Sequence, residues 1–273
     1  MNDNVLFALG LTLLAGLSTG IGSLIAFFAK KTNTKLLSMA LGFSAGIMIY
    51  ISMVELFYES RDLLISVLGK TSGPWITVAA FLGGIVFIGV IDRLVPKVEN
   101  PHEPLKVEDM DTCEYLKEDL TKDNTLMRAG LLTAIAIAIH NFPEGLATLA
   151  SSLRDPSLGI ATALAVAIHN IPEGISVSVP IYCATGSKKK AFRFSFLSGL
   201  SEPLGAIIGY LILMPFLNDA VFGILLGFIA GIMIFISLDE LLPLARKYDE
   251  AHLSMYGLVL GMAVMAVSLL MIG

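Results

Sequence analysis

Two segments of the chain, LTAIAIAIHNFPEGLATLAS at residues 132–151 and ATALAVAIHNIPEGISVSVP at residues 161–180, repeat one pattern. Each is an apolar stretch that contains a histidine, an asparagine, a proline and a glutamate within six residues. Ionisable side chains are costly inside a bilayer, where they usually mark a transport pathway or a binding site. We therefore expect the two His-Asn-x-Pro-Glu-Gly motifs to decide both the fold and the function.

The composition of the whole chain indicates a membrane protein. Of its 273 residues, 55% are hydrophobic and 15% are charged, a balance that a soluble domain of this length does not carry. The net charge of −5 is mild and indicates no nucleic-acid partner. Because no basic residue precedes the first apolar run, we expect this run to be kept as a helix rather than cleaved as a signal peptide.

Apolar segments of about 20 residues, the length that spans a bilayer as a helix, predict eight transmembrane helices. Their ranges are 5–29, 36–58, 74–94, 127–151, 158–183, 191–215, 219–241 and 253–272. Lysine and arginine accumulate in cytoplasmic loops, and here they follow the first, third, fifth and seventh helices, apart from Arg61, Lys70 and Arg154. We therefore expect a multi-pass protein of the cell membrane with both termini outside.

The chain is interpreted as one transmembrane transporter domain over residues 1–273, with a single sizeable polar segment at about 95–126. This segment is rich in acidic residues and is predicted to be a solvated cytoplasmic linker. Weak metal buffering through its acids and His102 is the alternative interpretation.

An internal repeat lies outside the two motifs. GFSAGIMIYISMVEL at residues 42–56 matches GFIAGIMIFISLDEL at 227–241, and GLSTGIG at 16–22 resembles GLSEPLG at 199–205. In the predicted topology the matching helices run in opposite directions, so helices 1–3 and 6–8 form an inverted repeat around central helices 4 and 5. An inverted repeat of this kind is typical of secondary transporters, which bind their substrate near the middle of the membrane. The predicted fold is thus an all-α membrane protein with eight helices in a 3+2+3 arrangement.

The spacing inside each motif predicts a metal site. His140 and Glu144 are four residues apart, as are His169 and Glu173, so each pair lies on one helix face. Both histidines lie about 18 Å from the turn that joins the two helices, at ~1.5 Å per residue. Two imidazoles and two carboxylates therefore converge at one depth. Such mixed nitrogen and oxygen ligands suit Zn²⁺, Fe²⁺, Mn²⁺, Co²⁺ or Cd²⁺ and do not choose among them.

Further polar residues lie beside these four. Asn141 and Asn170 follow the histidines and are candidate oxygen ligands of an adjacent second site. Glu202, next to Pro203, is interpreted as a ligand of that second site, with a purely structural kink as the alternative. The acids near the ends of helices 2 and 7 are either pathway ligands or merely hydrated terminal residues: Glu55, Asp239 and Glu240.

These motifs resemble the ZIP family of divalent-metal transporters (Zrt/Irt-like proteins), particularly its bacterial members, over essentially the whole chain. The resemblance implies eight helices in a 3+2+3 arrangement, termini outside the cell and a cytoplasmic loop after helix 3. It implies a primary site of His140, Glu144, His169 and Glu173, and a second site of Asn141, Asn170 and Glu202 that Glu144 and Glu173 bridge. It also favours an elevator-like motion, whereas the inverted repeat alone permits rocking as well.

We therefore predict a transporter that moves zinc, iron(II) or related cations into the cytoplasm. Divalent ions and the bilayer are its expected partners, a homodimer is possible, and no catalytic cofactor is expected. An intramembrane metallohydrolase is the alternative, but the chain lacks the His-Glu-x-x-His string of such enzymes. A proton-coupled carrier of organic solutes is a second alternative, yet the arginines that would bind such a solute lie only at the membrane edges.

Overall fold

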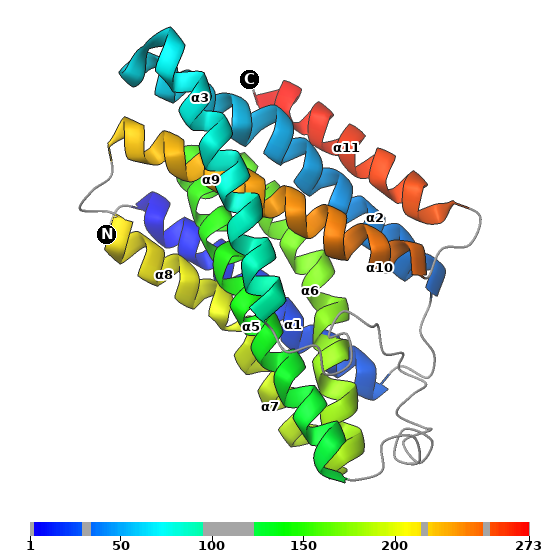
Figure 1. The fold of residues 1–273 in the computed structure, drawn as a ribbon. Coiled ribbons are helices and arrows are strands. Elements are labelled where there is room, and N and C mark those ends of the chain that lie inside the picture. Colours follow the sequence, from blue (N-terminus) through cyan, green and yellow to red (C-terminus); the bar gives the residue numbers. More distant parts are fainter. Residues whose placement is uncertain (1–2, 29–33, 95–122, 214–217, 248–251, 273) are drawn as a thin grey trace.

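The computed structural model describes residues 3–28, 34–94, 123–213, 218–247 and 252–272, and all of these ranges are almost wholly helical (Figure 1). The elements are α1 (Asp3–Phe28), α2 (Thr34–Tyr50), the π-helical η1 (Ile51–Leu56), α3 (Phe57–Leu94), α5 (Asp123–Arg154), α6 (Pro156–Thr185), α7 (Lys188–Gly199), α8 (Ser201–Leu213), α9 (Asp219–Ile236), the π-helical η4 (Ser237–Leu241), α10 (Leu242–Lys247) and α11 (Leu253–Ile272). Most of the acidic segment predicted at 95–126 lies outside the described residues.

Seven candidate membrane spans are present in the described ranges, and these confirm an all-helical membrane fold. One candidate, Thr34–Ile91, is 58 residues long, about 87 Å at 1.5 Å per residue and far longer than a bilayer is thick. Its backbone leaves the helix at Gly69, inside α3, where φ is +83°, and the chain turns back there (Figure 1). The predicted helices 36–58 and 74–94 lie on either side of this reversal.

The helices form two groups. The first, which we call the motif bundle, consists of α1, α5, α6, α7 and α8, which contact one another. The second, the flanking layer, consists of the pairs α2 with α11 and α3 with α9 (Figure 1). Contacts of α2 with α6 and of α5 with α9 join the two groups.

The largest buried apolar cluster of the described residues fills the flanking layer and extends to α5 and α6 of the motif bundle. It includes Met48 of α2, Met233 of α9, Ala147 of α5 and Ala165 of α6, all at most 2% exposed. Many large apolar side chains on the outer faces are exposed instead, for example Leu14, Val86 and Leu211. Exposed apolar residues of this kind suit helices that face lipid.

The turn between α5 and α6 is short and well capped. Only Asp155 separates the two helices, and its carboxylate accepts from Ser157 N at 2.8 Å and Leu158 N at 3.0 Å. Pro156 is the first residue of α6, a position whose N–H has no partner within the helix, so the missing N–H of proline costs no hydrogen bond. These features hold the two motif helices as an antiparallel pair.

The sixth predicted helix, 191–215, is divided into α7 and α8 at Leu200. The ring of Pro203 would clash with the carbonyl of Gly199 four residues earlier in a continuous helix, and Pro203 has no N–H to bond it. Pro203 instead stands in the first turn of α8, where proline is tolerated. By contrast, α5 and α6 continue through Pro143 and Pro172.

Candidate metal site

The two motifs meet on the facing sides of α5 and α6. Asn141 of α5 is fully buried. When its carboxamide is oriented so that nitrogen donates, Nδ2 lies 3.1 Å from Ile137 O and 3.3 Å from Glu173 Oε2. Turned the other way, the carboxamide places its oxygen against these same oxygens, an arrangement that needs a cation or a proton between them. The first motif therefore contacts a carboxylate of the second.

A second contact ties α6 to α1 and α8. Nδ2 of Asn170 donates to Ala15 O at 3.0 Å and also to Glu202 Oε1. Asn170 and Glu202 are both fully buried, and a buried carboxylate requires such donors. Oδ1 of Asn170 receives no hydrogen bond within the described part of the chain, which leaves a neutral oxygen ligand beside Glu202.

Backbone contacts bring α8 against the first motif. A Cβ atom added to Gly145 would collide with the backbone carbonyl of Glu202, and one added to Gly205 would collide with that of Phe142. Only glycine permits two helices to approach this closely. The close approach of α5 and α8 places Glu202 next to the first motif, against the face of α5 that contacts α8.

The second motif packs on α1 in the same manner. A Cβ atom on Gly174 would meet the carbonyl of Thr19, and one on Gly22 would meet that of Ile171. Phe142 and Ile171 occupy the same position in the two motifs, and Glu202 and Thr19 occupy the same position in the internal repeat. The contacts of α5 with α8 and of α6 with α1 therefore correspond residue by residue.

The carboxylates of the predicted primary site are enclosed to different degrees. Glu144 is 1% exposed and Glu173 is half-buried. The side chains of His140 and His169 lie outside the described residues, although α5 and α6 run through both positions. The side chains that are described include no group of three or more His, Cys, Asp or Glu residues able to hold a metal ion. The structure thus brings together Asn141 with Glu173 and Asn170 with Glu202, and it leaves the predicted four-ligand site untested.

The structure adds buried hydroxyls to the list of candidate ligands. Thr19 of α1 and Thr148 and Ser151 of α5 are fully buried, and their hydroxyls have no hydrogen-bond partner among the described residues. Thr148 and Ser151 follow Glu144 at spacings of four and seven on one helix face. That spacing was visible in the sequence, but isolated hydroxyls in an apolar helix are ordinarily interpreted as structural.

The terminal acids lie in two matching π-helical segments. Glu55 is in η1 and is half-buried, whereas η4 contains Asp239, which is exposed, and Glu240, which is buried. In both segments a serine bonds back one turn: Ser52 Oγ donates to Met48 O at 2.6 Å, and Ser237 Oγ donates to Met233 O at 2.7 Å. π-Helical turns occur frequently at functional sites.

An ion pair joins the flanking layer to the motif bundle close to η1. Arg154, the last residue of α5, lies 2.8 Å from Glu59 Oε1, which belongs to the first turn of α3. The arginine side chain is 47% exposed and the glutamate 20% exposed. This pair marks the end of the α5–α6 hairpin at which the two groups of helices come together.

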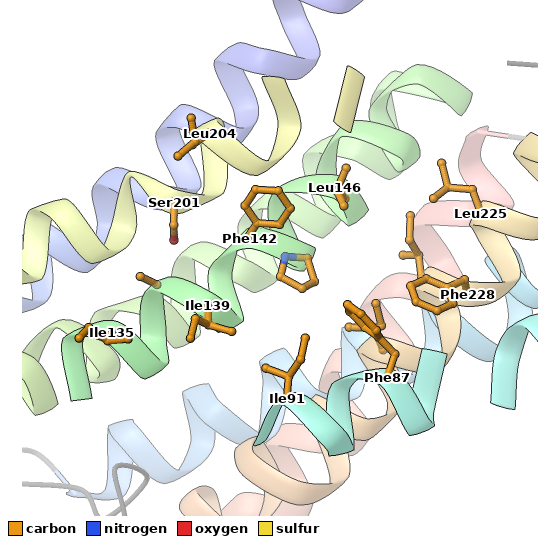
Figure 2. Close-up of a pocket in the computed structure, with 14 residues that line it drawn as sticks. Phe87, Ile91, Ile135, Ile139, Phe142, Leu146, Ser201, Leu204, Leu225 and Phe228 are labelled. Carbon is orange, nitrogen blue, oxygen red and sulfur yellow. The ribbon is translucent and has the colours of Figure 1, made fainter. Parts of the chain in front are cut away.

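One cavity lined by described residues is apolar and contains none of the predicted metal ligands. It measures about 500 Å³ and lies between α3, α5, α8 and α9. Figure 2 shows Phe142 of α5 and Phe87 of α3 on facing sides of the cavity, with Ser201 as its polar residue. The Ser201 hydroxyl donates to Ser198 O at 2.6 Å. The cavity therefore offers no metal ligand and lies on the side of the first motif that faces α3 and α9.

Comparisons with known proteins find similar chains over the full length. The model of the family described as ZIP Zinc transporter matches residues 93–269. A protein named Zinc transporter ZupT from Oceanobacillus iheyensis is 66% identical over 270 residues, which are 99% of each chain. Proteins of the same name are 61% identical in Lysinibacillus sphaericus over the whole of both chains, and 62% identical in Clostridium perfringens over 98% of this chain and 97% of the relative. The similarity covers the full length.

Proposed function

Because the chain belongs to the ZIP family of zinc transporters, we propose that it carries Zn²⁺ into the cytoplasm through a site between α5 and α6. The family consists of transporters, so the metallohydrolase interpretation is set aside. The observation that carries the proposal is the contact of Asn141 in the first motif with Glu173 in the second. This contact supports two motifs that act on one ion rather than two separate polar defects.

The primary site consists of His140, Glu144, His169 and Glu173. The hairpin supports it, because the turn at Asp155 holds the two motifs at one level of an antiparallel pair. Neutral imidazoles and ionised carboxylates are the ligands that zinc prefers in mixed sites. The same ligands accept Fe²⁺, Mn²⁺, Co²⁺ and Cd²⁺, which belong to the proposed range of substrates.

The second site consists of Asn141, Asn170 and Glu202, bridged to the first by Glu144 and Glu173. The bond of Asn170 to Glu202 and the available Oδ1 of Asn170 support it. Thr19 occupies the position in α1 that Glu202 occupies in α8. Because α1 has a hydroxyl where α8 has a carboxylate, the proposed site has a charged ligand on its α8 side and an uncharged one on its α1 side.

We propose eight crossings in a 3+2+3 arrangement, with helices 1–3 and 6–8 as inverted repeats. The corresponding contacts of α5 with α8 and of α6 with α1 support this symmetry, as does the close backbone contact between Gly16 and Gly199, which are counterparts in the repeat. The reversal at Gly69 divides the longest candidate span in two. With the lysine-rich loops in the cytoplasm, both termini lie outside.

Transport requires the site to open alternately to each side. In the motif bundle, close backbone contacts join α1 to α6 and α5 to α8, and these leave little room for relative movement. We propose that this bundle moves as one unit against the flanking layer. Its apolar boundary with α9 and the partly exposed ion pair of Arg154 with Glu59 are contacts that such a movement can break and remake.

The test is zinc uptake by the full chain in metal-starved cells. The double variant Glu144→Ala with Glu173→Ala is expected to abolish uptake, whereas Asp219→Asn, an exposed acid at the start of α9, is expected to leave it unchanged. Immunoblots of the membrane fraction check that all variants are expressed equally. Zinc accumulation by the double variant at the unaltered rate would overturn the proposal, and competition with Fe²⁺, Mn²⁺ and Cd²⁺ measures its range.

A further inference from the structure

Three polar residues form a stripe along the second half of α5. Glu144, Thr148 and Ser151 are separated by four and three residues, so their side chains lie within about 60° of one another around the helix at ~100° per residue. All three are at most 1% exposed. The stripe therefore presents a carboxylate and two hydroxyls to the interior.

The two hydroxyls differ from the others nearby. Serine and threonine in a helix usually donate to the carbonyl one turn back, as Ser152 does to Thr148 O at 2.6 Å and Thr162 does to Leu158 O at 2.9 Å. The hydroxyls of Thr148 and Ser151 make no such bond within the described residues. A buried hydroxyl without a partner costs free energy, so its presence requires an explanation.

The residues of α5 on either side of the stripe show that it lies at the boundary between the motif bundle and the flanking layer. On one side of it Ser152 packs against Gly159 of α6, and on the other Ala147 and Ala150 belong to the core shared with α9. The stripe thus faces the junction of α5, α6 and the flanking layer. This is the boundary that opens if the motif bundle moves.

The stripe also leads from Glu144 toward the turn at Arg154. At ~1.5 Å per residue, Thr148 lies about 6 Å and Ser151 about 10 Å from Glu144 along the axis, and the Arg154–Glu59 ion pair lies about 15 Å away. Each step is short enough for an ion to pass from one oxygen ligand to the next. Hydroxyls bear no charge, and an ion pathway requires such weak intermediate ligands so that the ion is released again.

We infer that Thr148 and Ser151 form a transient binding site for a partly hydrated divalent cation, between the Arg154–Glu59 end of α5 and Glu144. The inference rests on the proposed zinc transport. In this site the hydroxyl oxygens replace water molecules of the ion before Glu144 binds it. The missing hydrogen bonds of the two side chains follow from this role, because the oxygens are reserved for the ion.

The experiment uses the full chain in proteoliposomes with a fluorescent zinc indicator inside. Thr148→Val with Ser151→Ala is expected to lower the initial uptake rate about fivefold, the factor that one net hydrogen bond is worth. Its melting temperature should stay the same or rise, because the variant removes unsatisfied polar groups. Thr148→Ser keeps the hydroxyl and should retain uptake.

The matched control is Thr162→Val, which removes a buried hydroxyl that does have a partner. It should lower the melting temperature and leave uptake unchanged. Uptake at the full rate by the Thr148→Val, Ser151→Ala variant would overturn the inference. An equal loss of uptake in Thr148→Ser, which keeps the hydroxyl, would overturn it as well. The amount of zinc that the purified protein binds at equilibrium should be the same in the hydroxyl variants as in the unaltered protein. The double variant Glu144→Ala with Glu173→Ala should bind none. A full complement of bound zinc in the latter would instead refute the proposed function itself.

Discussion

Replacing Gly145 with alanine is expected to separate α5 from α8 and to displace Glu202. The added Cβ would collide with the Glu202 carbonyl oxygen and would lie 2.7 Å from its carbonyl carbon and 3.0 Å from its Cα, whereas ordinary contacts begin at 3.4 Å. Because the carbonyl oxygen is nearer still, the two backbones must move apart by more than about 1 Å, and neither can give way by a side-chain rotation. Overpacking of this kind costs roughly 1–3 kcal/mol of stability.

The same displacement should slow transport. Glu202 bonds Asn170 of the second motif, so a shift of α8 moves a proposed ligand relative to its partner. A misplacement of about 1 Å can cost about 100-fold in rate at a positioned site, so for this shift we expect a loss of at least about tenfold. Thermal unfolding by circular dichroism and zinc uptake in proteoliposomes measure the two effects.

Gly10→Ala is the matched control. An added Cβ at Gly10 meets nothing within 4 Å, and alanine in a helix interior is more stable than glycine by about 0.5–1 kcal/mol. This variant should therefore melt slightly higher and transport normally. If Gly145→Ala melted and transported like the unaltered protein, the reasoning from backbone contact would be refuted.

Three further predictions concern single side chains and pH. Asn170→Ala should lower the free energy of unfolding by about 1–3 kcal/mol, because buried Glu202 loses its amide donor; an unchanged melting temperature would contradict this. Arg154→Ala should change the free energy of unfolding by at most about 1 kcal/mol, since its pair with Glu59 is partly exposed. That difference should shrink in high salt, and a larger, salt-independent loss would argue against the assignment. Zinc uptake should fall on acidification, because protons compete with metal for the imidazoles of the proposed ligands His140 and His169; a rate that rises on acidification would count against these ligands.

The membrane fold was predictable because hydropathy acts over some 20 residues at a time. A few polar residues, such as Glu173 and Glu202, do not outweigh the apolar side chains around them. The turn at Asp155 was also predictable, since an aspartate followed by proline is a strong signal for the beginning of a helix. The pairing of α5 with α6 followed from that turn and from the matched motifs.

Local departures from the α-helix were not predictable. η1 and η4 have sequences that fit an ordinary helix, and nothing in the sequence distinguishes Ser52 and Ser237 from other helical serines that bond the carbonyl one turn back. The division at Leu200 had a signal in Pro203, but Pro143 and Pro172 carry the same signal without a division. Proline therefore marks a possible break, and its surroundings decide whether the break occurs.

The candidate site was predictable in its residue types and only partly in its contacts. The matched motifs indicated that α5 and α6 face each other, whereas only the resemblance to a family placed Asn141 and Glu173 at one site. The bond between Asn170 and Glu202 joins helices far apart in sequence, and only a resemblance to a family pointed to it. The hydroxyls of Thr148 and Ser151 find no hydrogen-bond acceptor or donor among the described residues. Whether a neighbouring helix provides such a partner cannot be predicted from the sequence alone.

The close backbone contacts around the two motifs also limit how the preference for one metal over another can change during evolution. Where helices touch through glycine and carbonyl groups, as at Gly145 and Gly174, no side chain is available to widen or narrow the space around the ion. A new preference must then arise by exchange of the ligands themselves, for example Asn170→Asp, which adds a charge without changing the shape. Laboratory selection for cadmium exclusion or iron preference should accordingly yield substitutions at a few ligand positions, with the glycines unchanged.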